Sequence, residues 1–130
     1  MEYHHMALSV RNLEDSLVFY KDVFGFVEIN RFERENLGLK IAFMKLKNGD
    51  DLRLELVQPR EPIKNEDDFS NLNILGLKHL CFEVENVDKK YKELKSKGYD
   101  VTEPKEGKSI KKYLFVKDPN GFLVEICESY

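Results

Sequence analysis

The sequence has little cysteine, almost no charge imbalance and no long apolar run, and each lack excludes a class of protein. Two cysteines in 130 residues, Cys81 and Cys127, do not make a disulfide framework, so we expect reduced thiols. Twenty-one basic and 24 acidic residues are interspersed and give a net charge of -3, which favours neither nucleic acid nor an anionic membrane as a partner. No stretch approaches the roughly 18 apolar residues that a membrane-spanning helix needs.

The N-terminal segment MEYHHMALSV lacks the basic and apolar regions of a signal peptide, and we therefore expect a cytoplasmic protein. The chain has 130 residues, of which 42% are hydrophobic, and this is enough to bury a sizeable core. We therefore expect one domain, residues 1–130.

The strongest pattern in the sequence is an internal repeat with an offset of 74 residues. Pairs of identical residues related by this offset include His5 and His79, Val10 and Val84, and Asn12 and Asn86. Apolar residues spaced i, i+4, i+7 follow each Asn, at Leu13, Leu17 and Tyr20 and at Val87, Tyr91 and Leu94. This spacing predicts two amphipathic helices, each capped by its Asn and ended by a glycine, Gly25 or Gly98.

Strand-like stretches surround both helices. They are predicted at Phe26–Glu33, Leu39–Lys47 and Asp51–Gln58 in the first half, and at Tyr99–Glu103, Lys111–Lys117 and Phe122–Glu128 in the second. Asn48-Gly49 and Asn120-Gly121 are the strongest turn signals between them. Each half therefore has the order strand, helix, strand, strand, strand. The sequence predicts an α+β fold of two tandem βαβββ modules, residues 1–58 and 76–130.

The segment between the two modules, residues 59–75, is polar, acidic at its centre and long for a connection. Two interpretations remain open for this crossover loop. It is a lid over a pocket, or it is a solvated linker.

Two histidines stand in strand-like segments that are otherwise apolar. Because strand side chains alternate between faces, His5 shares a face with Ala7 and Ser9, and His79 shares one with Cys81 and Glu83. The apolar faces are expected to pack against the helices, which leaves both histidines on the opposite face. A histidine surrounded by apolar groups must form a hydrogen bond or bind something.

Two carboxylates repeat in the same way. Glu55 interrupts LRLELV and Glu125 interrupts FLVEIC, each in the last predicted strand of its half. Two such buried carboxylates repel each other unless a cation compensates them. Two imidazoles and two carboxylates suit Zn²⁺, Ni²⁺, Co²⁺ or Fe²⁺ better than Ca²⁺. Taken singly, each residue is more often structural, but the paired repeat favours a metal site. His4 is interpreted as a surface or packing residue.

Three segments resemble the vicinal oxygen chelate superfamily, which includes glyoxalases, bleomycin resistance proteins and extradiol dioxygenases. They are HHMALSVRNLEDSLVFYKDVFGF, GLKHLCFEVENVDKKYKELKSKGYDV and VKDPNGFLVEI. The resemblance implies paired βαβββ modules whose strands form a cup around a divalent metal. It implies the ligands His5, Glu55, His79 and Glu125, in the order found in glyoxalase I, with Ni, Zn or Co as the metal and Fe as a further option.

The glyoxalase I branch implies a lyase that isomerises a methylglyoxal–thiol hemithioacetal to an S-2-hydroxyacyl thioester, as a lactoylglutathione lyase does in methylglyoxal detoxification. By the same analogy Glu125 is the leading catalytic base and Glu55 the second. The segment NLGLKIAFMKL resembles methylmalonyl-CoA epimerases, whose usual Gln in place of Glu55 weighs against that alternative. An extradiol dioxygenase or a non-catalytic drug-binding resistance protein are the other readings.

Some pocket residues follow from the same resemblance. Ser9 stands where glutathione users commonly have an Arg, which puts the thiol in doubt. Lys108, in EGKSIKKY, offers positive charge to a substrate anion, although a solvated lysine is the more frequent case. Cys81 and Cys127 follow His79 and Glu125 by two residues and are candidates for lining the substrate pocket. The expected partners are a small-molecule substrate and a second copy of the chain, with the metal site either within one subunit or across a homodimer.

Overall fold

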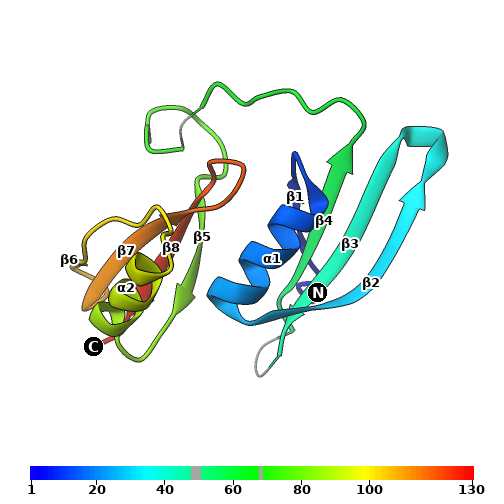
Figure 1. Ribbon diagram of the computed structural model, residues 1–130. Coiled ribbons are helices and arrows are strands. Elements are labelled where there is room, and N and C mark those ends of the chain that lie inside the picture. Colours follow the sequence, from blue (N-terminus) through cyan, green and yellow to red (C-terminus); the bar gives the residue numbers. More distant parts are fainter. Residues whose placement is uncertain (48–50, 68) are drawn as a thin grey trace. The chain divides into compact units, whose positions relative to one another are not determined.

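The structure is a computed structural model that describes residues 1–47, 51–67 and 69–130. Its internal contacts divide the chain into two units, Met1–Lys64 and Asn65–Tyr130, each built around its own sheet and helix (Figure 1). In the described part of the chain, no helix has the length and apolar character needed to cross a membrane.

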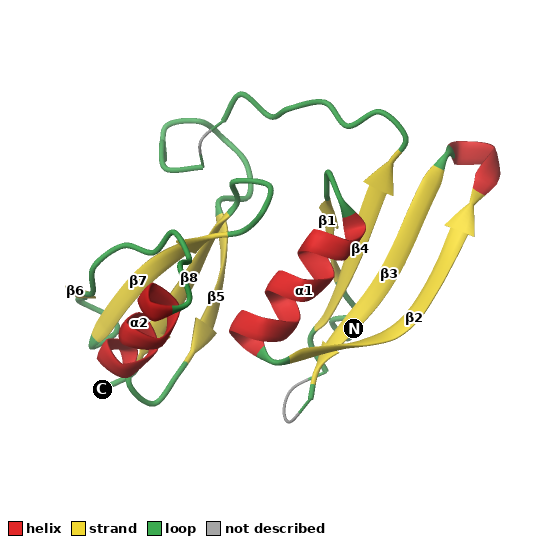
Figure 2. Cartoon of the chain, in the orientation of Figure 1, coloured by secondary structure: helices red, strands yellow, loops and turns green. Residues whose placement is uncertain are grey.

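The first unit is a four-stranded mixed sheet covered on one face by a helix (Figure 2). Its elements in chain order are β1 (Met6–Ser9), α1 (Leu13–Phe24), β2 (Phe26–Arg34), the 3-10 turn η1 (Glu35–Leu37), β3 (Leu39–Leu46) and β4 (Arg53–Pro59). The strand order is β1-β4-β3-β2, with β1 parallel to β4 and the other pairs antiparallel.

The second unit repeats this plan. Its elements are β5 (His79–Glu83), α2 (Val87–Ser96), β6 (Lys105–Glu106), β7 (Lys112–Lys117) and β8 (Leu123–Glu128). The strand order is β5-β8-β7-β6, and β5 is parallel to β8 just as β1 is to β4. The predicted α+β fold of two βαβββ modules is therefore confirmed.

Both helices begin as predicted. The side chains of Asn12 and Asn86 accept hydrogen bonds from the backbone N–H groups of Asp15 and Lys89, at 3.0 and 2.8 Å, and so satisfy donors that a helix start leaves unpaired. Gly25 ends α1 in the left-handed conformation, at φ 75°.

Each helix start has a second acceptor that sequence reasoning missed. Gln58 Oε1 accepts the N–H of Leu13 at 2.7 Å, and Glu128 Oε2 accepts the N–H of Val87 at 3.0 Å. Both acceptors lie at the end of the last strand of their unit, so an equivalent contact joins the helix to the sheet in each unit. The Lys111 ammonium also contacts Glu128, and these two partners lower the pKa of the Glu128 carboxyl.

Strand alternation separates a core face from an open face in both sheets. The core faces pack under the helices, and their buried residues include Ala42, Met44, Leu54 and Leu56 in the first unit and Leu114, Val116, Val124 and Ile126 in the second. The intervening odd-numbered residues, such as Phe43 and Glu55, point to the face without a helix. The open face is the one that carries the predicted ligands.

One predicted strand is wrong. Tyr99–Glu103 forms only an isolated bridge between Val101 and Val116, and the two-residue β6 follows at Lys105. Pro104 has no N–H to donate and interrupts the ladder, which resumes at Lys105, the register partner of Tyr113. Ahead of it, the Thr102 hydroxyl accepts the N–H of Phe115 at 2.9 Å, a bond that a strand carbonyl would otherwise accept.

The two turn signals have different outcomes. The Asn120-Gly121 turn is confirmed between β7 and β8, with Gly121 at φ 86° and the Asp118 carboxylate accepting two backbone N–H groups. Asn48-Gly49 lies outside the described residues.

Beyond Pro59, the last residue of β4, the described part of the crossover loop has neither helix nor strand, and its second half is tied to the second unit. The Lys78 ammonium donates to Asp67 at 2.8 Å, and the Phe69 ring lies edge-to-face on Phe122 with centroids 5.2 Å apart. These contacts anchor the loop next to the strand that begins with His79. Whether it closes over a pocket stays a prediction.

Candidate functional site

In the first unit, His5 and Glu55 come together on the open face of the sheet. Glu55 lies in the middle of β4, paired in register with Ala7 of β1 and Phe43 of β3. His5 precedes β1 by one residue instead of lying inside it as predicted, and its Nε2 is 3.0 Å from Glu55 Oε2.

The second unit places His79 and Glu125 in the same relation. His79 is the first residue of β5, Glu125 lies in the middle of the parallel strand β8, and His79 Nε2 is 2.8 Å from Glu125 Oε2. Cys81 and Phe115 are the register partners of Glu125, at the places that Ala7 and Phe43 hold beside Glu55. The repeat in the sequence is thus a repeat of a His–Glu pair in space.

Each histidine also contacts a phenylalanine that sequence reasoning missed. The rings of His5 and Phe43 lie edge-to-face with centroids 5.5 Å apart, and those of His79 and Phe115 do so at 5.3 Å. Both spacings fall in the favourable range for aromatic pairs. The strand register contains the signal that could have identified these contacts. Each Phe is the direct register partner of the Glu in its pair, on a neighbouring strand that a predicted turn joins to the strand of the Glu.

The imidazoles are not buried as expected. The side chains of His5 and His79 are 35% and 33% exposed, while those of Glu55 and Glu125 are 19% and 14% exposed. The reason is that neither helix covers the sheet face on which they lie. Each His–Glu pair therefore keeps solvent-accessible surface on the face without a helix.

The two pairs have the donor chemistry of a metal site. Imidazole nitrogen and carboxylate oxygen are ligands of Zn²⁺ and of related divalent ions. In each pair the two atoms already lie close together, at 3.0 and 2.8 Å. Within either unit, the described residues contain no group of three or more His, Cys, Asp or Glu able to hold a metal ion. The gathering of all four ligands on one ion stays a prediction.

The two thiols have different surroundings. Cys127 is buried, whereas Cys81 has exposed surface. Partial burial of the Cys81 thiol raises its pKa above the usual range, and contacts with Cys127 and Glu125 raise it further. Cys81 therefore stays a neutral thiol beside Glu125, where it can line a pocket but is a poor nucleophile.

Three other residues were considered in the sequence, Ser9, Lys108 and His4. Ser9 is exposed at the end of β1, and Lys108 is exposed in the loop between β6 and β7. His4, interpreted as a surface or packing residue, contacts the site, since its Nδ1 is 2.7 Å from His5 Nδ1 and its Nε2 is 3.3 Å from Arg53 Nη1.

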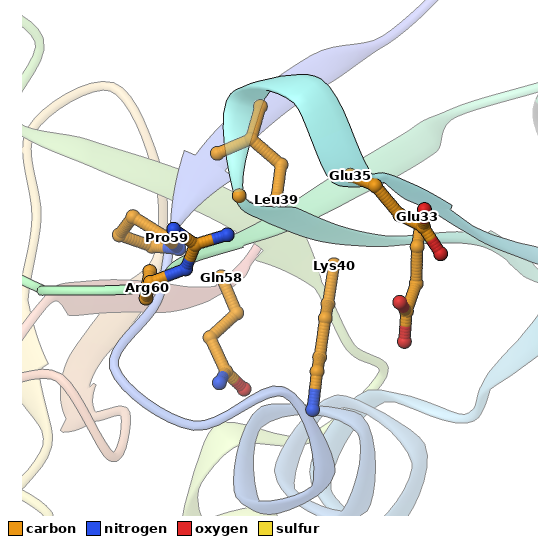
Figure 3. A pocket seen from close by; sticks show the side chains of 8 residues that line it. Glu33, Glu35, Leu39, Lys40, Gln58, Pro59 and Arg60 are labelled. Carbon is orange, nitrogen blue, oxygen red and sulfur yellow. The ribbon is translucent and has the colours of Figure 1, made fainter.

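A cavity of about 530 Å³ lies elsewhere on the first unit (Figure 3). Lys40 and Gln58, which line it, are even-numbered residues of β3 and β4 and so point to the helix face, away from Glu55. Figure 3 shows both side chains pointing toward the helix, with Arg60 at the strand end. The cavity is therefore separate from the His5–Glu55 pair.

Residues 4–115 match the family described as the Glyoxalase/Bleomycin resistance protein/Dioxygenase superfamily. Over 96% of its length, the chain is 31% identical to a mitochondrial methylmalonyl-CoA epimerase of Dictyostelium discoideum, of which 76% is covered. An ethylmalonyl-CoA/methylmalonyl-CoA epimerase of Cereibacter sphaeroides is 32% identical, with 95% of this chain and 94% of that protein covered. Glyoxylase I 4 of Arabidopsis thaliana is 29% identical, with 95% and 68% covered.

Among solved structures, a glyoxalase family protein from Enterococcus faecalis superposes with a TM-score of 0.80. It is 26% identical, and 98% of this chain and 97% of that chain are covered.

Proposed function

Since the chain belongs to the glyoxalase/bleomycin resistance protein/dioxygenase superfamily, we propose that it is a metal-dependent enzyme that moves a proton at a carbon next to a carbonyl group. The observation that carries the proposal is the pair of repeat-related His–Glu contacts, His5 with Glu55 and His79 with Glu125. Each contact offers one nitrogen and one carboxylate oxygen on an open sheet face.

In this proposal the four side chains hold one divalent ion, and the two units contribute equally. The four donors come from one chain or from two subunits of a homodimer. When bound, the ion supplies a Lewis acid that stabilises negative charge on substrate oxygens. Ni, Zn, Co and Fe all suit two imidazoles with two carboxylates.

The proton is moved by a carboxylate of the chain. In a glyoxalase reaction, one Glu side chain takes the proton from the carbon next to the carbonyl and returns it to the neighbouring carbon. In an epimerisation, one Glu takes the proton from one face of the carbon, and the other Glu, in its protonated form, donates a proton to the opposite face. Glu125 is the leading base and Glu55 the second. The side chains of Phe43 and Phe115 bring apolar surface next to these carboxylates, which limits water around them.

The relatives favour a coenzyme A thioester as the substrate. Proteins named as methylmalonyl-CoA epimerases align with nearly the whole chain at 30–32% identity. For such a substrate a proton is removed from one face of the carbon and another is donated to the opposite face of the same carbon, so the product is the epimer.

A glyoxalase I activity is the second candidate, and one observation favours it. Glu55 occupies the second ligand position, where the resemblance implies Glu in glyoxalase I and usually Gln in the epimerases. Relatives named Glyoxylase I 4 and lactoylglutathione lyase also align with 95% of the chain, at 29% and 26% identity.

Deuterium uptake tests the proposal and separates the two candidates. The purified protein, loaded in turn with Co²⁺, Ni²⁺ and Zn²⁺, is incubated in D₂O with methylmalonyl-CoA or with methylglyoxal plus glutathione. Deuterium appearing at carbon 2 of the acyl group identifies the epimerase, and formation of the hydroxyacyl thioester identifies the glyoxalase. If neither reaction proceeds with any of the three metals, this function is wrong.

Replacing each carboxylate by its amide assigns the base. Glu125→Gln is expected to abolish proton exchange, and Glu55→Gln is expected to lower it less while weakening metal binding. Turnover and bound metal are measured together for both variants. If Glu125→Gln keeps wild-type turnover, the assignment of the base to Glu125 is incorrect.

A further inference from the structure

Two cations lie beside the His5–Glu55 pair on the open face of the first sheet. Lys45 of β3 and Arg53 of β4 are direct register partners. They lie two residues along their strands from the partners Phe43 and Glu55, and therefore on the same face of the sheet. The Cα atoms of Arg53 and Glu55 are therefore about 6.6 Å apart along the strand, from a rise of about 3.3 Å per residue.

In the described part of the chain, this cation pair has no carboxylate partner. Among the residues that the structure describes, no carboxylate forms an ion pair with Lys45 or Arg53, including the nearby Asp51. Arg53 instead donates from Nη1 toward His4 Nε2, at 3.3 Å. Like charges placed directly opposite each other on a sheet destabilise it. The fold thus keeps an unfavourable pairing next to the candidate ligands.

The second unit does not repeat the arrangement. The strand partners at the equivalent ladder step are Lys117 and Leu123, so the Arg is replaced by an apolar residue. Lys117 Nζ also lies 3.8 Å from the carboxylate of Asp100. The His, Glu and Phe side chains are shared by both units, whereas the facing pair of Lys and Arg occurs, among the described residues, in the first unit and is replaced by Lys117 and Leu123 in the second.

We propose that Lys45 and Arg53 bind an oxyanion of the substrate, a carboxylate or a phosphate on its thiol carrier, while the reacting carbon lies near Glu55. This inference rests on the proposed function and names the charge its substrate carries. A guanidinium presents paired N–H donors that match a carboxylate or phosphate, and the ammonium adds a point charge. The cation pair supplies the positive charge that Ser9 cannot.

Both carriers are tested by direct binding. Coenzyme A brings phosphates and glutathione brings carboxylates, and each is titrated by calorimetry into wild-type protein and into Arg53→Gln and Lys45→Met. These substitutions remove the charge and keep most of the side-chain length. Loss of one charge-assisted contact is expected to weaken binding of the recognised thiol by about ten- to a hundredfold. Raising the salt concentration is expected to reduce the difference in affinity between the wild-type protein and the variants.

Two matched controls accompany these variants. Lys40→Met removes a cation from the opposite face of the same strand, and Lys117→Met removes the repeat-related lysine of the second unit. Both are expected to bind the thiol as wild type does. A thermal melt of each variant checks that it is folded.

The outcomes separate the two candidate carriers. Coenzyme A binding that falls in Arg53→Gln and Lys45→Met supports a phosphate site, and glutathione binding that falls in them supports a carboxylate site. If neither thiol binds the wild-type protein, or if binding survives both substitutions, the inference is overturned. Titration of the same proteins with Co²⁺ tests the proposed function separately. A wild type that binds no metal refutes that function, whatever Arg53 does.

Discussion

The contact between Phe115 and His79 predicts a measurable effect on metal affinity. An aromatic pair with a centroid separation of 5.3 Å contributes about 0.5–1.5 kcal/mol beyond the burial of apolar surface. Leu at position 115 fills much of the volume but has no ring to hold the imidazole edge-to-face. If the contact fixes the orientation in which His79 presents Nε2, Phe115→Leu lowers the affinity for Co²⁺ or Zn²⁺ by about two- to tenfold.

The assay is calorimetric titration of metal into metal-free protein, with a thermal melt of each variant alongside. Phe43→Leu, at the equivalent place beside His5, is expected to have an effect of the same size, because the ring separation there is 5.5 Å. Phe115→Tyr keeps the ring and is expected to restore wild-type affinity. Such a rescue separates a positioning role from general loss of stability.

Tyr113→Leu is the matched control. The Tyr113 ring lies on the same face and contacts Phe115, with centroids 6.0 Å apart, whereas the ring that contacts His79 is that of Phe115. Loss of the Tyr113 ring is expected to leave metal affinity unchanged. Equal affinities for wild type, Phe115→Leu and Phe43→Leu would refute the positioning role, and so would a Tyr113→Leu variant that loses as much affinity as Phe115→Leu.

Three further predictions concern the scaffold. Asn12→Ala and Asn86→Ala each remove a helix cap and are expected to lower the free energy of unfolding by about 1 kcal/mol, measured by urea denaturation. Because the pKa of folded Glu128 is lowered, its contribution to stability is present above the unfolded pKa and is lost as the pH falls through the folded pKa. When the pH is lowered from about 6 to about 3, the urea midpoint of the wild-type protein should therefore fall more steeply than that of Glu128→Gln. Gly38→Ala would hold an alanine at a φ of 67° and place its Cβ 3.2 Å from the Arg60 guanidinium carbon. We expect it to destabilise the folded protein by about 1 kcal/mol. An unchanged melting temperature would contradict this expectation.

Much of this fold could be predicted because the chain carries its plan twice. The offset of 74 residues aligns Asn12 with Asn86, and both of these residues cap a helix. Alternation then assigns the faces of the strands correctly. The prediction of a strand at Tyr99–Glu103 is wrong, because residue type alone did not show that the strand pairing would be interrupted before Pro104.

The candidate site was only partly visible in the sequence. The pairing of His5 with Glu55 follows from the repeat and from strand alternation, and the distances within both pairs agree with it. The sequence placed both histidines on the sheet face opposite the helix, but it did not show that a third of each imidazole side chain would be exposed there, because that depends on the positions of the neighbouring side chains. The contact of His79 with Phe115 required the register of three strands at once, β5, β8 and β7.

The differences between the two units fit a division of labour between the proposed metal binding and the proposed substrate recognition. His, Glu and Phe occur on the open face of both sheets, which is the arrangement expected if two equivalent half-sites hold the metal. The surrounding positions differ, because Arg53 in one unit corresponds to Leu123 in the other and Ala7 corresponds to Cys81. A substrate with one reacting carbon and one anionic arm has no twofold symmetry, so the residues that recognise it cannot be equivalent in the two units. Changes at Arg53 should therefore alter which thiol is bound and leave the metal in place, whereas changes at Phe115 should do the reverse.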